Sequence, residues 1–254
     1  MSVESSRWWK RFVDDCGPEK LSPFPKALAE TLPIVADTTQ LLDIGCGCGI
    51  IGSYCLLQKA ARSVTFTDIM PEWIALARAN VQRKIDSGRI LQSQAFFTNA
   101  MPFQDLPAET IAKHDLIAFN PPQLPARLVA PEALRKIESD AIEQMYRIGS
   151  ESGNDDGLAM ARKFFAWFAG LPKPRPEAAI LLSSFLGISN IEAAIASYRL
   201  PWKIIANTRA PLRDFFIPAA DRIYRSSAAG REDRLLEKLD SGFTKALLTI
   251  KLGP

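Results

Sequence analysis

The sequence predicts an α/β fold with a doubly wound, mostly parallel sheet of seven strands, the last of them antiparallel. Two observations carry this prediction. From residue 40 onward, short apolar or β-branched segments alternate with longer segments of helical pattern, which is typical of parallel strands joined by crossover helices. Some of the short segments are apolar runs, as expected of strands that are covered by helices on both faces.

Each predicted element rests on a local signal. Residues 40–45 form an apolar run that stops at a glycine, and residues 63–69 are short and rich in β-branched side chains, so both are predicted strands. Residues 71–88 begin with a proline and end at a glycine, which are the usual signs of a helix start and end. The other predicted strands are 89–97, 114–120, 178–187, 202–209 and 243–252, and the other predicted helices are 50–60, 131–148, 156–170 and 190–200.

Two stretches lie outside this alternation. Residues 1–40 place Trp8 and Trp9 in a short helical pattern that is followed by a proline-rich connector, and we predict an N-terminal helical extension or lid. Plain core packing explains the two tryptophans equally well. Residues 209–242 are rich in Arg, Asp and Ala, and we predict an insertion within a catalytic domain that covers residues 41–254.

The composition excludes several classes of protein. With 47% hydrophobic and 23% charged residues, the chain resembles an ordinary globular protein, and a net charge of +3 is too mild to indicate nucleic-acid binding by itself. No apolar run is long enough to span a membrane, and the N-terminus does not resemble a secretory signal. The four cysteines lack disulfide or zinc spacing and there is one histidine, so we expect reduced thiols, no metal and a cytoplasmic location.

The first chemical signal is the turn after the first predicted strand, where Asp43 precedes Gly45, Cys46, Gly47 and Gly49. Closely spaced glycines allow the chain to turn sharply and let a ligand approach the backbone with no Cβ in the way. The acid would repel a pyrophosphate. It suits the ammonium at the methionyl end of S-adenosylmethionine, so we expect this turn to bind that end.

A second acid ends the second predicted strand. Asp68 follows Asp43 by 25 positions, which is the spacing expected for the carboxyl end of the next strand. There it can accept hydrogen bonds from both hydroxyls of a ribose, and Ile69 or Met70 would pack on the adenine. Two alternatives stay open for the turn and this acid together: an NAD-type oxidoreductase, or a tight turn without a ligand.

The third signal is the tetrapeptide Asn120, Pro121, Pro122 and Gln123 at the end of another predicted strand. In an open, Rossmann-like sheet the carboxyl ends of parallel strands share one crevice. If Asn120 Oδ1 and the Pro121 carbonyl accept the two N–H groups of an amide or amine, the nitrogen lone pair points at the methyl group to be transferred. Prolines fix the direction of that carbonyl. The alternative is that the prolines only end a strand and bind nothing.

Together these motifs resemble a known family. LLDIGCGCG, TDIM and NPPQ are similar to the motifs of class I S-adenosylmethionine-dependent methyltransferases of the Asn-Pro-Pro-Tyr type, above all the HemK-like glutamine N-methyltransferases of release factors. The resemblance extends over roughly residues 20–190, since LSPFPKALAETL and SGNDDGLAMARKF are similar to two further segments of that family. It implies that S-adenosyl-L-methionine is the cofactor and that residues 120–123 form the acceptor site. The expected cofactor contacts are Asp43, Gly45, Cys46, Gly47, Gly49, Asp68, Ile69, Ala95, Phe96 and Asn120.

The sequence departs from the family pattern in three places. Gln123 stands where the family has an aromatic residue, and it could hydrogen-bond the acceptor instead. The usual acid after the third strand is missing, so the contact to adenine falls to the backbone near Ala95 and Phe96, or to Asn99. About forty residues precede the first strand, too few for the helical substrate domain of the release-factor enzymes.

Several functions are compatible with these residues. The short N-terminal stretch and the mild charge favour transfer of a methyl group to an amide or amine nitrogen of a small molecule. The first alternative is N-methylation of an RNA or DNA base or of a protein glutamine, with the arginines of residues 209–242 as a basic face, although acids interleave with them. An S-methyltransferase and a catalytically silent S-adenosylmethionine-binding scaffold are further alternatives.

Overall fold

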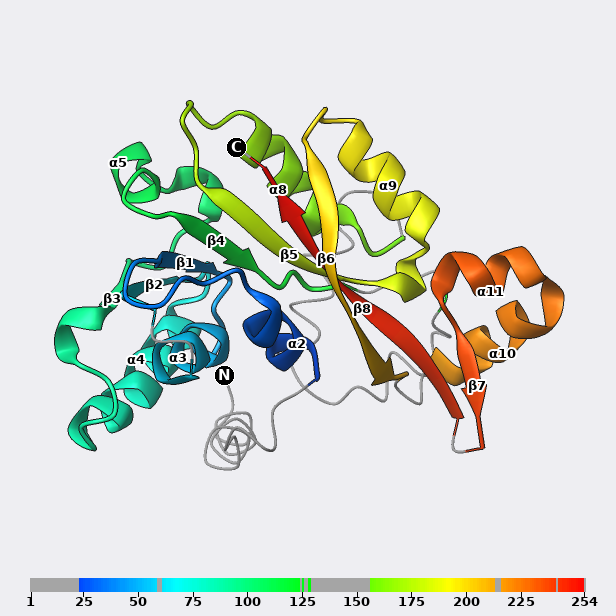
Figure 1. The fold of residues 1–254 in the computed structure, drawn as a ribbon, viewed down its shortest axis with the longest axis horizontal. Helices are drawn as coiled ribbons and strands as arrows, with labels where there is room; N and C mark the ends of the chain where they lie inside the picture. Colours follow the sequence, from blue (N-terminus) through cyan, green and yellow to red (C-terminus); the bar gives the residue numbers. More distant parts are fainter. Residues whose placement is uncertain are drawn as a thin grey trace. The chain divides into compact units, whose positions relative to one another are not determined.

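The computed structural model describes most of the chain (Figure 1). The described residues are 23–58, 61–123, 125, 128, 156–212, 216–240 and 242–253. The predicted helix that carries Trp8 and Trp9 and the helix predicted at 131–148 lie outside these residues.

The described strands form one eight-stranded sheet in the order β3-β2-β1-β4-β5-β8-β6, with β7 paired to β8. Their bounds are β1 Gln40–Ile44, β2 Ser63–Thr67, β3 Ala95–Phe97, β4 Leu116–Phe119, β5 Glu177–Ser183, β6 Trp202–Pro211, β7 Glu237–Leu239 and β8 Gly242–Leu252. Strands β1 to β5 pair in parallel, whereas β8 pairs antiparallel with β7 and runs opposite to β6 in Figure 1. The predicted fold class is confirmed, and the short strand β7 is the one addition to it.

The described helices alternate with the first five strands and then cluster before the last one. Their bounds are α2 Pro23–Thr31, α3 Ile50–Gln58, α4 Pro71–Asp86, α5 Ala108–Ile111, α8 Ala159–Ala169, α9 Ile188–Ala196, α10 Ile217–Ser226 and α11 Ala228–Arg234, with 3₁₀ turns at η2 Gln92–Gln94, η3 Phe103–Asp105 and η5 Ser184–Leu186. Helix α4 begins with Pro71. An N–H group in the first turn of a helix has no partner within the helix, so a residue without an N–H is tolerated there.

The chain divides into two compact units. The first comprises Met1–Asn120, Pro172–Leu181 and Thr249–Pro254, and the second comprises Pro121–Leu171 and Leu182–Leu248. The first unit contains the strand ends of β1, β2 and β4, at which the chemical signals of the sequence are found. The boundary between the two units falls inside the Asn-Pro-Pro-Gln tetrapeptide.

The core of the first unit forms where helices pack closely on the strands. All four residues of β4 are buried, and α3 packs so near β2 that its inner face includes a glycine. A Cβ at Gly52 would lie 2.4 Å from the ring of Phe66 and 2.6 Å from Val64. Glycine is therefore what allows this close helix–strand contact.

In the second unit, the described part of residues 209–242 contains the end of β6, the helices α10 and α11 and the strand β7. Helix α10 is strongly amphipathic and buries Ala219 and Ala220 against Phe243 of β8. The buried cluster contains Phe185, Leu212, Phe216, Ala219, Ala220, Leu236 and Phe243. The cluster combines apolar residues from several short elements. This packing explains why a stretch with a weak local pattern forms regular structure.

Candidate functional site

The register of the sheet brings three strand ends level with one another. Ile44 of β1 pairs with Thr67 of β2 and with Phe119 of β4. The residues that follow these ends therefore lie at the same edge of the sheet. They are the glycine-rich turn, Asp68 and Asn120, which the sequence analysis singled out.

The glycine-rich turn is fixed by hydrogen bonds to the end of β2 and to α4. The Cys46 amide donates to the Thr67 carbonyl at 3.0 Å, and the Gly47 amide donates to Asp68 Oδ2 at 2.9 Å. Asn80 Nδ2 donates to the Cys48 carbonyl at 2.8 Å. Gly47 has φ of +53°, a left-handed conformation that side-chain-bearing residues rarely adopt. The turn is thus rigid and presents its backbone at the sheet edge.

The cysteines of this segment are buried thiols. Cys46, Cys48 and Cys55 form no disulfide among the described residues. Burial raises the pKa of the Cys46 thiol, and the nearby carboxylates of Asp43 and Asp68 raise it further. Cys46 is therefore a protonated, apolar lining residue of the turn rather than a nucleophile.

Asp43 is completely buried at the end of β1. Its Oδ2 accepts a hydrogen bond from the Gly52 amide at 3.0 Å, which ties β1 to the first turn of α3. Its Oδ1 has no hydrogen-bond partner within the described part of the chain. Burial raises the pKa of Asp43 to about 7, the Gly52 hydrogen bond opposes this shift, and the negative charge of Asp68 adds to it. A positive group beside Asp43 would favour its charged form.

Asp68 directly follows β2 and uses both oxygens to shape the site. Oδ2 accepts from the Gly47 amide, and Oδ1 accepts from the Met70 amide at 3.0 Å. Burial raises the pKa of Asp68, whereas these backbone hydrogen bonds lower it. Each carboxylate oxygen has a second lone pair, so Asp68 can still accept two hydroxyls. The next side chain, Ile69, is 48% exposed and offers an apolar surface beside them.

The third strand places its residues differently along the sheet edge. Ala95 pairs with Val64 and Phe96 with Thr65, so both lie further back along the strand than Asp68. The Met101 amide donates to the Asp68 carbonyl at 3.0 Å, which brings residues 98–101 alongside that acid. The backbone and Asn99 in this loop are thus better placed for a ligand on Asp68 than Ala95, which is buried.

Asn120 is the first residue after β4. Its Oδ1 is buried and has no hydrogen-bond partner among the residues described. The preceding Phe119 packs edge-on against Phe103, with ring centroids 5.6 Å apart, and lies 3.5 Å from where a Cβ of Gly45 would be. Asn120 is therefore next to a rigid strand end, with an unsatisfied acceptor that normally costs free energy to bury.

Gln123 has an internal partner that its sequence context does not indicate. Its Oε1 accepts a hydrogen bond from the Ser183 amide, at the end of β5, at 2.7 Å. We expected the side chain to be able to contact the acceptor, but its oxygen is already used within the protein. Pro121 is buried, and Pro122 is partly exposed.

The described residues have the chemistry that the expected cofactor requires. Asp43 Oδ1 suits an ammonium, Asp68 suits a ribose, and the left-handed Gly47 leaves the backbone accessible. No group of three or more possible metal ligands is found in the described part of the chain. No described helix has the length and apolar character needed to cross a membrane.

The comparison with protein families gives one match. A family model described as "Methyltransferase small domain" matches residues 19–150. Ribosomal RNA small subunit methyltransferase C of Mannheimia succiniciproducens is 34% identical over 101 residues, which are 40% of this chain and 27% of that relative. A putative protein N5-glutamine methyltransferase of Methanocaldococcus jannaschii is 26% identical over 183 residues, which are 72% of this chain and 81% of that relative.

Solved structures share the fold at low sequence identity. A chain in the complex between the Haloferax volcanii Trm112 methyltransferase activator and the putative methyltransferase superposes with a TM-score of 0.54 and 14% identity, covering 100% of this chain and 99% of its own. A putative methyltransferase complexed with SAH gives a TM-score of 0.51 and 12% identity, covering 91% of this chain and 50% of its own. These likenesses concern the fold alone.

Proposed function

The chain belongs to the methyltransferase small domain family and uses S-adenosyl-L-methionine, and we propose that the methyl group is transferred to an amide or amine nitrogen. The observation that carries the nitrogen assignment is the buried Oδ1 of Asn120, which has no hydrogen-bond partner among the residues that the structure describes. A buried carbonyl oxygen without a donor is costly, and an N–H group of a bound acceptor would satisfy it.

The chemistry of such an acceptor explains the tetrapeptide. The lone pair of an amide or aromatic amine is delocalised into a π-system, so the nitrogen is a weak nucleophile. Asn120 Oδ1 and the Pro121 carbonyl, both acceptors, would hold its two N–H groups and stabilise the positive charge that grows on nitrogen. The prolines restrict the backbone that carries this carbonyl. The contribution of the protein is thus orientation and charge stabilisation, without a covalent intermediate.

We assign the cofactor to the edge formed by β1 and β2. S-adenosyl-L-methionine supplies an electrophilic methyl group on its sulfonium. Asp43 would hold the ammonium of its methionyl end, Asp68 would accept the ribose hydroxyls, and Ile69 would pack against the adenine. The turn at Gly45 and Gly47 would lie against the cofactor. Support comes from Asp43 Oδ1, which has no hydrogen-bond partner in the described part of the chain, from the carboxylate of Asp68 at the end of β2 and from the exposed Ile69.

The relatives point to a macromolecular acceptor rather than a small molecule. The M. jannaschii relative, matched over 81% of its length, is named for a protein glutamine, and the M. succiniciproducens relative, matched over 27%, is named for ribosomal RNA. We therefore place the side-chain amide of a protein glutamine first and an exocyclic amine of ribosomal RNA second. The small-molecule acceptor that we expected from the sequence has no support from these relatives.

The test is label transfer from methyl-labelled S-adenosyl-L-methionine to a panel of acceptors. The panel contains glutamine-containing proteins and peptides, small-subunit ribosomal RNA, free glutamine, simple amines and a thioether. The expected result is label recovered as an N-methyl group on the glutamine amide or on a base. Label on the thioether, or none on any acceptor despite cofactor binding, would favour sulfur transfer or a silent scaffold and would refute the nitrogen assignment.

A further inference from the structure

The ladder between β4 and β5 identifies the next hydrogen bond that a regular sheet would make. The Glu177 amide donates to the Asp115 carbonyl at 3.0 Å, and the parallel register runs from Leu116↔Glu177 to Phe119↔Ile180. In a parallel pair, every second residue of a strand donates to the same neighbour. Residues 179, 181 and then 183 are therefore the successive donors on this side of β5.

The two prolines interrupt this ladder. A regular continuation would need an N–H from residue 121, which proline does not have. The following bond of the ladder would run from the Ser183 amide to the Pro121 carbonyl. Such a bond would occupy the same carbonyl that the proposed function needs for the acceptor nitrogen.

The Ser183 amide donates to Gln123 Oε1 instead, at 2.7 Å. A side-chain oxygen thus takes the place of a main-chain carbonyl. The Pro121 carbonyl accepts no hydrogen bond from any residue that the structure describes. The oxygen of Gln123 thus occupies the Ser183 amide, the donor that a regular ladder would direct at the Pro121 carbonyl.

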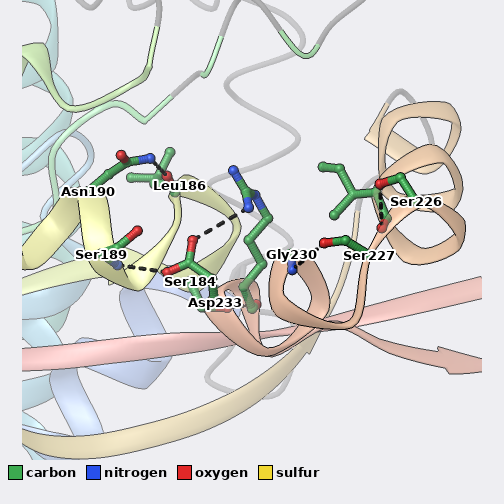
Figure 2. A network of polar contacts seen from close by, with 10 residues as sticks. Ser184, Leu186, Ser189, Asn190, Ser226, Ser227, Gly230 and Asp233 are labelled. Carbon is green, nitrogen blue, oxygen red and sulfur yellow. Dashed lines mark hydrogen bonds and ion pairs between the residues drawn. The ribbon is translucent and has the colours of Figure 1, made fainter.

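The segment that receives Gln123 is itself held firmly. Ser184 Oγ donates to the Arg234 carbonyl at 2.5 Å and accepts from the Ala246 amide at 3.0 Å. Just beyond it, Asp233 of α11 accepts from the Ser189 amide at 2.8 Å (Figure 2). Ser183 is therefore an amide on a fixed scaffold, and a side chain bonded to it acquires a fixed position.

We propose that Gln123 is a positioning residue: its side-chain oxygen accepts the Ser183 amide and so leaves the Pro121 carbonyl available to bind the N–H of the methyl acceptor. This proposal rests on the proposed function. It assigns to the Gln123 oxygen a role inside the protein, in contrast to a direct contact between the Gln123 amide and the acceptor.

Two variants separate these roles. Gln123→Glu keeps an oxygen that can accept the Ser183 amide but loses the Nε2 donor, and Gln123→Met has similar length without any acceptor. Gln82→Met, on the exposed face of α4, is the matched control for loss of a glutamine amide. Two quantities are measured for each protein: amide hydrogen exchange of Ser183 by NMR, and kcat and KM for the acceptor labelled in the panel, alongside affinity for S-adenosylhomocysteine.

In Gln123→Met, we expect Ser183 to exchange roughly fivefold to tenfold faster. We expect kcat to fall roughly 10- to 100-fold, through loss of orientation, with unchanged affinity for S-adenosylhomocysteine. Gln82→Met should stay close to wild type in all of these measurements, and Gln123→Glu should keep Ser183 exchange close to wild type and lose clearly less kcat than Gln123→Met. The proposal is overturned if Gln123→Glu loses as much kcat as Gln123→Met, if Gln123→Met stays fully active, or if Ser183 exchange does not respond. A wild type that labels no acceptor refutes the proposed function instead, and Ser183 exchange in Gln123→Met would still respond in that case.

Discussion

Two buried acids, Asp43 and Asp68, determine the electrostatics of the site residue by residue. One oxygen of Asp43 accepts the Gly52 amide, and the other has no partner among the described residues, whereas both oxygens of Asp68 accept backbone amides. Both side chains are almost inaccessible to water, so a charge on either is costly without a partner. A bound cation beside Asp43 would remove most of that cost.

The raised pKa of Asp43 predicts that cofactor affinity depends on pH. In the free protein the carboxyl is mostly protonated below about pH 7, and an ammonium binds the carboxylate form better. Affinity for S-adenosylhomocysteine should therefore rise as the pH increases through 7, until the ligand's own amino group loses its proton near pH ~8. Calorimetry across this range measures it. Asp43→Asn should lose the rise below pH 7, and an identical rise in that variant would contradict the assignment.

The raised pKa of Asp43 also predicts that the free protein becomes less stable as the pH rises, whereas its affinity for the cofactor increases. A buried carboxyl whose pKa moves from 3.8 to about 7 favours folding when it is protonated. This contribution of Asp43 to stability is complete below about pH 4 and is lost as the pH rises through 7. Saturating S-adenosylhomocysteine should reverse that loss, because the ligand binds only the folded protein and favours the charged form.

A double-mutant cycle tests the ribose assignment of Asp68. Asp68→Ala should weaken S-adenosylhomocysteine binding roughly 10- to 100-fold, the range expected for hydrogen bonds to a charged group. In the wild type, an analogue of S-adenosylhomocysteine without the 2′-hydroxyl should bind more weakly than S-adenosylhomocysteine itself. In Asp68→Ala, the two ligands should bind with equal affinity. Equal losses for the analogue in both proteins would mean that Asp68 only shapes the turn through Gly47.

The sequence predicts where some candidate residues lie in the fold and not where others lie, for a physical reason. Asp43, Asp68 and Asn120 each lie at or just after the end of a recognisable strand, and parallel strand ends align. The placement of Ala95 needs the register of β3, which a three-residue strand does not reveal from its pattern. The partner of Gln123 lies 60 residues away, so no local signal could identify it.

Helix α3 and strand β2 show at the level of elements how packing positions the turn. The helix has little polar face, and it approaches β2 until a single hydrogen atom is all that fits at position 52. This contact places the first turn of α3 where the Gly52 amide reaches Asp43. The alternation of strands and helices follows from the pattern of the sequence, whereas this close approach does not.

Replacement of Gly52 by alanine should therefore destabilise the fold. The added Cβ would lie within 2.4–2.8 Å of Phe66 and Val64, which cannot both move without disturbing β2. Overpacking of this kind costs about 1–3 kcal/mol. Chemical denaturation measures the loss in the free energy of unfolding. Gly170→Ala is the control, because its new Cβ would meet atoms only at ordinary distances of 3.5 and 3.6 Å and should change stability little.

Residues 209–242 illustrate the limit of pattern-based prediction at this scale. Their helices α10 and α11 have ten and seven residues, and α11 has no buried residues. Such short helices depend on tertiary packing more than on intrinsic propensity. The parallel part of the sheet could be predicted because strands such as β4 and β5 are almost entirely buried, while helix α10 forms through the cluster that contains Phe216 and Phe243.

For the molecule as a whole, fold and family establish a methyltransferase, and we propose that the strand end at Asn120 determines the acceptor. The mild net charge of +3 gives no strong field for a nucleic acid, and the arginines of the 209–242 region are largely paired internally. Arg209 is paired with Glu237, and Arg225 with Asp221. A protein amide as first acceptor is consistent with that charge distribution.

The most direct test of the account is label transfer by Asn120→Ala, with the exposed Asn207→Ala as the control. Asn120 would orient the acceptor nitrogen and not the cofactor, so the variant should bind S-adenosylhomocysteine with nearly wild-type affinity. Its turnover of the acceptor identified in the panel should fall by roughly 10²–10³, as for loss of one preorganised hydrogen-bond partner in an active site. Full turnover in Asn120→Ala would contradict the account, because the tetrapeptide would then only end a strand and the nitrogen assignment would have no physical basis.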